Sequence, residues 1–588
     1  MAPRGSESGP SSSRRAARTR TDRSAAGRPP VERDPGRLLR LAASPVFRVA
    51  CIAAVAVLAA GLSVLLFLRT EPGNIDDGFI LMVYIRHLIR DGTIAWNLGD
   101  GPVDGCTSML DLLIKSAVVQ LTEGDIVRCT FIVTAVFHVL VTLLPIAIIL
   151  RLPAGSPNRR LVAAAAVGLM LASMESGAYA ASFLLEMPLY VFCALGLAGL
   201  VVLTRRLSVL RMSSLVLASW MVALSRPEGL APATVLLGAA LWMGRCDQPL
   251  QRIFAAFGTF VAGMVIYQVW HFRHFGDWAP NAYYAKTSAL RVNEIRDGVS
   301  YVVAFLSNPA GWVQLGPVLL SPLAILGSHW SSPRARLHYA LFSWTAIGML
   351  AVTVYAGGDS YPAGRLLTPS IALGAFAVAF AIVHAQRRLG TVFLVVAGFV
   401  VLFQCVQVIA VAPTQWGSHV WVTVPGVRAC ETAFGNALGR VVPHGTIAET
   451  DFQRLKFWCD DLRVVDLEGL SNREIAHQRV TDPVRLGKFR PVTVLRMRPE
   501  VWIAGFRFRS NTSRVSAKPH PLLTSAETQM QVLGYDQKTK AAEGEVAVEL
   551  ANLYVPASLK VCDTIYNLFV RKDLAKKFSE TGFLVAGI

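Results

Sequence analysis

Long apolar runs dominate this chain and limit what it can fold into. The 588 residues are 53% hydrophobic and only 16% charged, whereas a soluble protein carries roughly 25% charged residues. A run of about 20 apolar residues can cross a bilayer as a helix. The sequence therefore predicts a polytopic α-helical membrane protein with about eleven crossings. The runs, several of them short, are 47–68, 128–150, 160–175, 181–203, 213–225, 229–243, 253–271, 310–327, 337–356, 366–384 and 389–412.

Arginines in the short loops predict the orientation of these helices. If the N-terminus is cytoplasmic, the arginine clusters between the runs all fall on the cytoplasmic side, as the positive-inside rule requires. The polar loops 69–127, 272–309 and 357–365 then lie outside, together with everything after residue 412. The arginine- and alanine-rich style is typical of a high-GC bacterium, so we expect a multi-pass protein of a bacterial plasma membrane.

The two ends of the chain differ from the apolar middle. Residues 1–45 are rich in Ser, Arg, Ala, Gly and Pro and are expected to form a disordered cytoplasmic tail. Residues 46–412 form the predicted transmembrane domain. Residues 413–588 predict an extracytoplasmic α/β domain, with strands at 462–467 and 492–497 and a helix at 472–478. For this domain we hypothesise a carbohydrate-binding role.

Charge and cysteine usage narrow the partners. The formal charge of +18 comes mostly from arginines in the tail and short loops, which suit anionic membrane lipid. No basic stripe is interleaved with aromatic residues, so no nucleic-acid partner is expected. No CxxC spacing suggests zinc. Cys106, Cys430, Cys459 and Cys562 fall in segments expected outside, where disulfides are permitted, and Cys430 with Cys459 is the predicted pair.

Two adjacent carboxylates follow the first apolar run. Asp76 and Asp77 open a helix predicted over 78–90. They could act as a base, bind a cation or hold sugar hydroxyls. A plainer interpretation is that Asp76 caps the helix and Asp77 favours its dipole. Arg86 and Arg90 share one face of this helix and suit a lipid phosphate, or they reach toward lipid headgroups.

Several short motifs follow one another between about residues 70 and 480. The first group is Asp-Asp at 76–77, Tyr-x-Arg at 84–86, Trp-Asn-x-Gly at 96–99 and Val-Asp-Gly-x-Thr-Ser at 103–108. Later come Arg-Pro-Glu-Gly at 226–229, Pro-Asn-x-Tyr-Tyr-x-Lys at 280–286, Gly-Gly-Asp at 357–359 with Arg365, and Asp-x-x-Gly-Leu at 466–470.

This order resembles the bacterial GT-C membrane glycosyltransferases and, among them, the terminal arabinofuranosyltransferases of mycobacteria. The chain departs from that pattern at Asp104, where a Glu is usual, at Cys106, where an aromatic residue is usual, and at 184–187, where Gly-Leu-Glu-Thr is usual. The resemblance implies transfer of a sugar on the outer face from a polyprenyl-phosphate donor, decaprenylphosphoryl-arabinose for the arabinofuranosyltransferases. The implied acceptor is a cell-wall arabinan. Pilins and lipid-linked glycans are alternative acceptors.

The chemistry of such a transfer assigns roles to named residues. A departing lipid phosphate needs positive charge, for which the candidates are Arg86, Arg226, Lys286 and Arg365. Arg226 lies in an apolar run, where a charge is functional by default, or it forms a structural ion pair with Glu228. Asp77 is the first candidate for the base that activates the acceptor hydroxyl, and Asp76 is the second. The sugar-binding candidates are Glu186, Glu228, Asn281, Tyr284 and Asp359, although Asp359 could equally be a turn residue.

Other assignments stay open at this stage. Paired carboxylates bind Mg²⁺ or Mn²⁺ well, but a donor with a single phosphate needs a metal less, so no obligatory metal or cofactor is expected. A polysaccharide polymerase or ligase would use a pyrophosphate-linked oligosaccharide. A transporter or lipid flippase would place charges at mid-membrane and show repeat symmetry. A sensor or scaffold would depend on the C-terminal domain alone.

Overall fold

The computed structural model describes most of the chain, in two units. The units are Met1–Cys51 and Ile52–Ile588. Of the first, it describes only residues 44–51, in helix α2 (Pro45–Arg69), so the predicted disordered tail lies almost wholly outside the described residues. Every feature that follows belongs to the second unit. The described ranges are 44–69, 76–287, 290–326, 330–359, 364–410, 420–449, 454–478, 491–503 and, without 551 and 563, 549–587.

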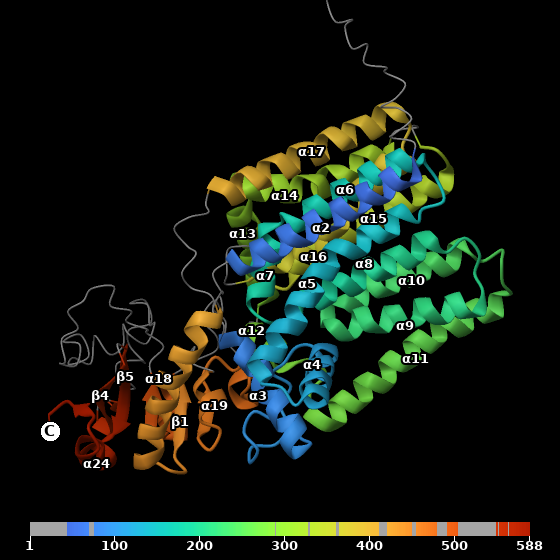
Figure 1. Ribbon diagram of the computed structural model, residues 1–588. Helices are drawn as coiled ribbons and strands as arrows, with labels where there is room; N and C mark the ends of the chain where they lie inside the picture. Colours follow the sequence, from blue (N-terminus) through green and yellow to red (C-terminus); the bar gives the residue numbers. More distant parts are fainter. Residues whose placement is uncertain are drawn as a thin grey trace, which may run out of the picture. The chain divides into compact units, whose positions relative to one another are not determined.

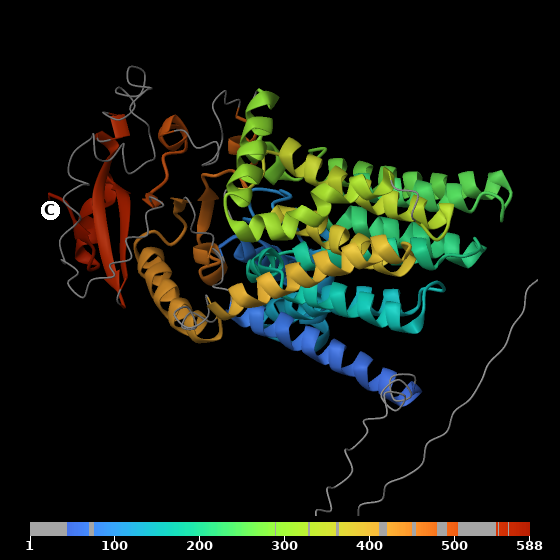
Figure 2. The ribbon, with the colours of Figure 1, turned by 90° about the horizontal axis from the view of Figure 1, so that it is seen from above.

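A helix forms at each apolar run, so the predicted helical bundle is confirmed. The helices of the second unit pack side by side in both views (Figures 1 and 2). They are α5 (Ile126–Leu150), α6 (Pro157–Ala172), α7 (Glu175–Ser182), α8 (Met187–Leu203), α9 (Val209–Ser225), α10 (Leu230–Met243), α11 (Leu250–Phe275), α13 (Arg291–Leu306), α14 (Pro309–Leu320), α15 (Pro333–Tyr355), α16 (Thr368–His384) and α17 (Arg387–Ala410).

Fewer helices are long enough to span a membrane than the sequence predicts. Six of the described helices pass by length and composition, and the bent pairs α6/α7 (48°) and α13/α14 (114°) raise the number to eight. A helix rises about 1.5 Å per residue and needs about 20 residues to span. Helices α8 and α9 have only 17 residues each and α10 has 14. Helix α16 lies at the centre of the bundle, and 94% of the residues in its most apolar stretch are buried.

Two further helices pack beside the bundle. Helix α3 (Asp76–Asp91) confirms the predicted helix after the paired aspartates, and α4 (Met109–Thr122) follows it. The middle of α3 is fully buried from Phe79 to Ile85. It packs against α4 and against α19 (Arg454–Trp458) of the C-terminal part. Helix α3 therefore joins the membrane bundle to the C-terminal domain.

The C-terminal part is an α/β domain, as predicted. Its six strands lie in the order β2-β1-β3-β5-β4-β6, with β1 parallel to β2 and β3 and the remaining pairs antiparallel. The elements are α18 (Val420–Val441), β1 (Thr446–Glu449), β2 (Arg463–Asp466), α20 (Arg473–Ala476), α21 (Pro491–Met497), β3 (Val501–Ile503), β4 (Tyr554–Val561), β5 (Thr564–Arg571), α24 (Ala575–Glu580) and β6 (Leu584–Val585).

The local predictions for this domain were partly right. Strand β2 lies within the predicted strand 462–467, and α20 lies within the predicted helix 472–478. The predicted strand 492–497 is wrong, because this segment is helical in α21. Pro491 occupies the first helical position, which proline favours, and Val494 is fully buried in the domain core. Proline placement and packing therefore override the strand propensity of the two valines.

The loop between α3 and α4 covers the free edge of this sheet. The side chain of Asn97 pairs with both backbone polar groups of Val464 on β2, donating to its carbonyl at 2.8 Å and accepting from its N–H at 3.1 Å. The Trp96 indole donates to the same carbonyl at 2.8 Å. Asn97 and Trp96 therefore satisfy groups that an edge strand would otherwise leave open.

A second contact between α3 and the C-terminal domain centres on Asp460. The carboxylate lies 2.8 Å from His87 Nε2, 2.7 Å from Arg90 and 3.4 Å from Lys456. Burial alone would raise the pKa of Asp460, but the hydrogen bond from His87 and the charge of Lys456 hold that pKa well below its usual range. The carboxylate therefore stays ionised and holds α3 against the C-terminal domain.

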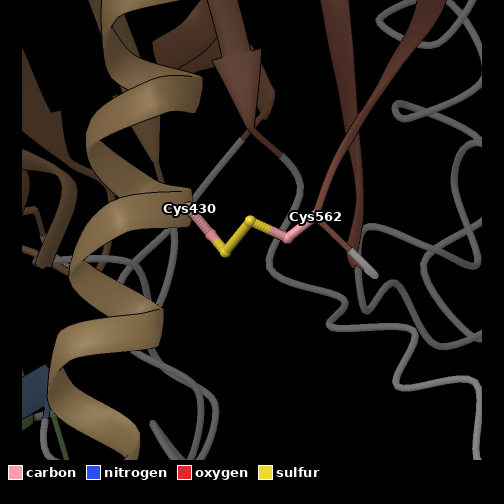
Figure 3. The surroundings of a disulfide bond; sticks show 2 residues. All are labelled: Cys430 and Cys562. Carbon is pink, nitrogen blue, oxygen red and sulfur yellow. A yellow bond between two sulfur atoms is a disulfide. The ribbon is translucent and has the colours of Figure 1, made fainter.

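The disulfide of this domain differs from the predicted pair. Cys430 on α18 bonds to Cys562 after β4 (Figure 3). Cys459 is a free cysteine. The sulfur of Cys459 instead packs against Gly435 of α18, where a Cβ would lie only 1.8 Å from it. That contact is five residues, or about 7.5 Å of helix rise, beyond Cys430. The bond closes a loop of 132 residues.

We expect the double substitution Cys430→Ser/Cys562→Ser to lower the free energy of unfolding by about 2–5 kcal/mol, because a long closed loop restricts the unfolded chain. Thermal unfolding of the detergent-solubilised protein measures this loss. Cys246→Ser, at an exposed free cysteine, is the control and should unfold like the wild type. An unchanged transition in the double variant would contradict the stabilising role of the bond.

The lowered pKa of Asp460 predicts a pH dependence. Its contacts stabilise the fold above the unfolded-state pKa of about 3.9, and that contribution is lost as the pH falls through the folded-state pKa. Asp460→Asn should cost about 1.5–3 kcal/mol at pH 7 and less at pH 3. Unfolding measured at both pH values tests this. Asp125→Asn, at a helix cap that asparagine also fills, should show no such difference.

Candidate functional site

A cavity of about 330 Å³ collects most of the predicted site residues. Its walls come from six separate stretches of the transmembrane region and from Leu470 of the C-terminal domain. Six predicted residues line it: Asp77, Glu186, Arg226, Glu228, Lys286 and Arg365. Cavities of this size accommodate small ligands.

One side of the cavity is formed by an ion-pair chain around Arg365. Its guanidinium donates two hydrogen bonds to the carboxylate of Asp359, at 2.7 and 3.1 Å, and lies 3.3 Å from the carboxylate of Asp77. The carboxylate of Asp359 is almost fully buried, whereas that of Asp77 is 21% exposed. Asp359 therefore orients Arg365, and of these two carboxylates Asp77 is the one that a ligand can reach.

The sequence around Arg365 shapes this arrangement. Gly358 and Gly364 have φ angles of +70° and +77°, a region that favours glycine. A Cβ on Gly364 would lie 2.4 Å from the Phe305 ring, and one on Gly358 would lie 2.5 Å from Tyr301. The ring of Phe183 covers the guanidinium of Arg365 at 4.2 Å. The glycines therefore allow the loop close enough to the bundle for the arginine to reach Asp77.

A second ion-pair chain is formed around Arg226. Its guanidinium contacts Glu186, which precedes α8, and Glu228. Glu186 is 2% exposed and Glu228 is 30% exposed. One oxygen of Glu186, Oε2, is buried and has no hydrogen-bond partner among the described residues. That oxygen is free to accept a hydrogen bond from a ligand in the cavity.

Proline and glycine place Arg226 at a break between two helices. Arg226 has φ −158° and ψ 146° and ends α9, as expected for a residue before a proline. Gly229 packs so closely that a Cβ would lie 2.2 Å from the carbonyl of Val222. The two interpretations of Arg226 are therefore compatible. Arg226 forms the ion pair with Glu228, and both residues line the cavity.

Basic side chains of another segment complete the cavity wall. Lys286 ends α12 (Asn281–Lys286), is exposed, and forms no ion pair with any residue that the structure describes. Arg291 also lines the cavity, donates to the Tyr283 hydroxyl at 2.7 Å and lies 4.8 Å from the Tyr355 ring. No motif singled out Arg291, and only its place in a polar loop after Lys286 could have suggested it.

A buried pair under the cavity supports its floor. His271 Nε2 lies 2.8 Å from Asp104, whose other oxygen accepts from the backbone of Cys106 at 3.3 Å. Cys106 and Thr107 line the cavity, and Thr107 has φ +56°. The Asp104–His271 pair therefore anchors the strained loop that forms the floor. Sequence reasoning missed His271, because it lies inside an apolar helix with no motif around it.

Three predicted site residues lie elsewhere. Arg86 donates to the carbonyl of Phe457 at 2.5 Å and covers that residue's ring. Asn281 is buried and donates to the carbonyls of Gly469 and Leu470 at 2.5 and 3.1 Å. Tyr284 stacks on His477 at 4.3 Å, and its neighbour Tyr283 lines the cavity instead. All three residues contact the C-terminal domain.

The paired aspartates were also considered as metal ligands. Asp76 begins α3, but its side chain lies outside the described part. Within the described part, no three His, Cys, Asp or Glu side chains gather as potential metal ligands. The expectation that no metal is obligatory therefore stays a prediction.

We expect Arg365→Leu to destabilise the protein by about 3–5 kcal/mol, because it leaves the buried carboxylate of Asp359 without its arginine. The double variant Arg365→Leu/Asp359→Leu removes both charges and should recover most of that loss. Thermal unfolding in detergent compares the two. Equal destabilisation by both variants would show that the ion pair is not what holds this loop.

Comparisons with known proteins give only distant similarity. No protein-family profile matches the sequence, and no curated protein matches it. Among solved structures, the chain is similar to a crystal structure of an Archaeoglobus fulgidus oligosaccharyltransferase tethered to an acceptor peptide, with 12% identity and a TM-score of 0.38 over 70% of this chain and 63% of that one. It is also similar to the oligosaccharyltransferase AglB of the same organism in complex with an inhibitory peptide and a dolichol-phosphate, with 10% identity and a TM-score of 0.41 over 88% and 74%. The chain thus spans less than two thirds of the first structure, and at these scores the likeness carries no weight for function.

Proposed function

We propose that this chain is a membrane glycosyltransferase of the GT-C type, which moves a sugar from a polyprenyl-phosphate donor to a glycan acceptor of the cell envelope on the outer face. The single observation that carries the proposal is the cavity. It gathers Asp77, Glu186, Arg226, Lys286 and Arg365 from segments up to 288 residues apart. The motifs that resemble this superfamily had marked those same residues.

The cations of the cavity suit a lipid phosphate. Lys286 is exposed, and Arg291 lies close to it in sequence on the same wall, where its ion pair with Glu294 is long, at 4.0 Å. Both can therefore meet a phosphate without first breaking an ion pair with Asp77 or Glu186. Arg226 and Arg365 already hold two carboxylates each. We therefore assign the phosphate to Lys286 and Arg291, whose positive charges stabilise the departing phosphate, whereas Arg226 and Arg365 hold the carboxylates of the cavity in place.

The carboxylates suit hydroxyl groups. Asp77 is the reachable member of its ion-pair chain and acts as the base. It takes the proton of the acceptor hydroxyl while that oxygen bonds to the anomeric carbon. The bond from this carbon to the phosphate oxygen breaks, and the phosphate leaves with the electron pair. Glu186 Oε2 and Glu228 accept hydrogen bonds from sugar hydroxyls. A wall of acceptors favours a neutral sugar over a uronic acid, which would bring a further negative charge.

The finer substrate assignment rests on the resemblance. Decaprenylphosphoryl-arabinose is the proposed donor, arabinofuranose the proposed sugar and a cell-wall arabinan the proposed acceptor. The C-terminal domain is proposed to help hold that acceptor beside the cavity, since Leu470 lines the cavity wall. Arg86, Asn281 and Tyr284 have no part in the proposed chemistry, because their polar or aromatic groups are engaged by the C-terminal domain.

The test is transfer from synthetic polyprenylphosphoryl-arabinose to an arabinan oligosaccharide by the purified full-length protein. Asp77→Asn should lower the rate by about 10²–10⁴-fold, the usual contribution of a general base, while donor binding is retained. Asp100→Asn is the matched control, because this carboxylate pairs with Arg463 away from the cavity, and its rate should stay near that of the wild type.

The other outcomes are equally informative. No product from the wild type with arabinose, but product with another polyprenyl-phosphate sugar, would replace the sugar and keep the reaction. Passage of the donor lipid across vesicles without product would overturn the proposal in favour of transport. Full activity of Asp77→Asn would remove Asp77 as the base.

A further inference from the structure

A fully buried lysine lies behind the cavity and outside every motif discussed above. Lys115, on α4, is 0% exposed. Its ammonium donates to Asp111 Oδ2 at 2.7 Å, one helical turn back, and to the backbone carbonyl of Leu184 at 2.9 Å. Asp111 is also buried, with 1% of the residue exposed. The ion pair is therefore neutral overall. Its other hydrogen bond joins the Lys115 ammonium to the Leu184 carbonyl, in a different segment of the chain.

That peptide group belongs to a strained turn. Leu184 has φ +58°, a left-handed conformation that an L residue with a branched side chain adopts only when its surroundings hold it there. Its N–H donates to the carbonyl of Ala181 at 2.9 Å. The hydrogen bond from Lys115 holds the other end of the residue. The ammonium thus fixes the turn that leads from α7 into α8.

The turn leads directly to one of the three carboxylates that line the cavity. Leu185 and Glu186 follow Leu184 directly and line the cavity. Glu186 holds Arg226 with one oxygen and leaves Oε2 without a partner among the described residues. A small rotation at Leu184 would move both that oxygen and its contact with Arg226.

The same turn touches the helix that carries Asp77. Gly78, the next residue after Asp77, lies so close to the turn that a Cβ on it would be 2.6 Å from the carbonyl oxygen of Phe183. Helices α3 and α4 are in contact with each other. The backbone at Phe183 and Leu184 is therefore wedged between Gly78 on one helix and Lys115 on the next.

We infer that Lys115 is a positioning residue, which holds the Leu184 peptide in its left-handed conformation and thereby sets Glu186 in the cavity. This inference rests on the proposed function of the cavity for its effect on rate. Its effect on the turn does not depend on which reaction the cavity carries out.

The test uses the double variant Asp111→Leu/Lys115→Met. Lys115→Met alone would leave a buried carboxylate unpaired and could unfold the protein, whereas removing both charges together is often neutral for stability. Glu431→Leu/Arg454→Met is the matched control, because it removes another ion pair with a buried carboxylate, at 3.1 Å, whose residues do not line the cavity. Thermal unfolding first confirms that both variants are folded.

Transfer kinetics supply the first readout. Asp111→Leu/Lys115→Met should lower kcat about tenfold or more, as misplacement of a binding group does, and the control pair should change it less than about threefold. In a Glu186→Gln background the same double substitution should cost less than about threefold, because the group that Lys115 positions has already lost its function. Equal losses in both backgrounds would overturn the inference, as would an unchanged kcat.

Amide hydrogen exchange supplies a second readout that needs no substrate. In Asp111→Leu/Lys115→Met, exchange should rise in residues 183–187 and stay unchanged in α6. Unchanged exchange at 183–187 would overturn the inference even if transfer is active. If the wild type transfers nothing, the proposed function fails, and the exchange data still decide whether Lys115 holds the turn.

Discussion

Two buried guanidinium groups impose the constraint on which this structure depends. Arg226 and Arg365 lie where water is largely excluded, and an unpaired ion there would cost several kcal/mol. Each contacts two carboxylates. Glu228 and Asp359 lie close to their arginines in sequence, whereas Glu186 and Asp77 come from segments 40 and 288 residues away. The interactions that neutralise the arginines therefore also define the walls of the cavity.

The C-terminal domain is part of the same construction. Asn281 binds the carbonyl of Leu470, and Leu470 lines the cavity. His87 and Arg90 hold Asp460, and Asn97 closes the edge of β2. These contacts hold α3, α12 and the loop between α3 and α4 against the C-terminal domain, so the shape of the cavity depends on both parts of the chain.

The sequence predicted the helices and much of the site, and its failures have physical causes. Apolar runs report exclusion from water, whether the helix is buried within the bundle, as α16 is, or lies mostly exposed on it, as α11 does. Glycine and proline dictate the backbone near Arg226 and Arg365. Arg86 and Asn281 lie outside the cavity, because they contact Phe457 and the carbonyls near residue 470, more than 180 residues away in sequence. Arg291 and Lys115 carry no local signal. The predicted disulfide was wrong for a related reason, because the position of Cys562 depends on how β4 and β5 pair.

The cap on β2 has a consequence for how the protein is made. Asn97 and Trp96 precede Val464 by 367 and 368 residues, so the ribosome completes nearly the whole helical bundle before their partner exists. Contacts of such high sequence separation form late and slowly. During synthesis the side chains of Asn97 and Trp96 therefore stay hydrated until β2 is made. The edge of β2 then has to pair with these side chains and not with another strand. A nascent chain stalled before residue 464 would therefore display an unfilled cap, a natural place for a chaperone to bind.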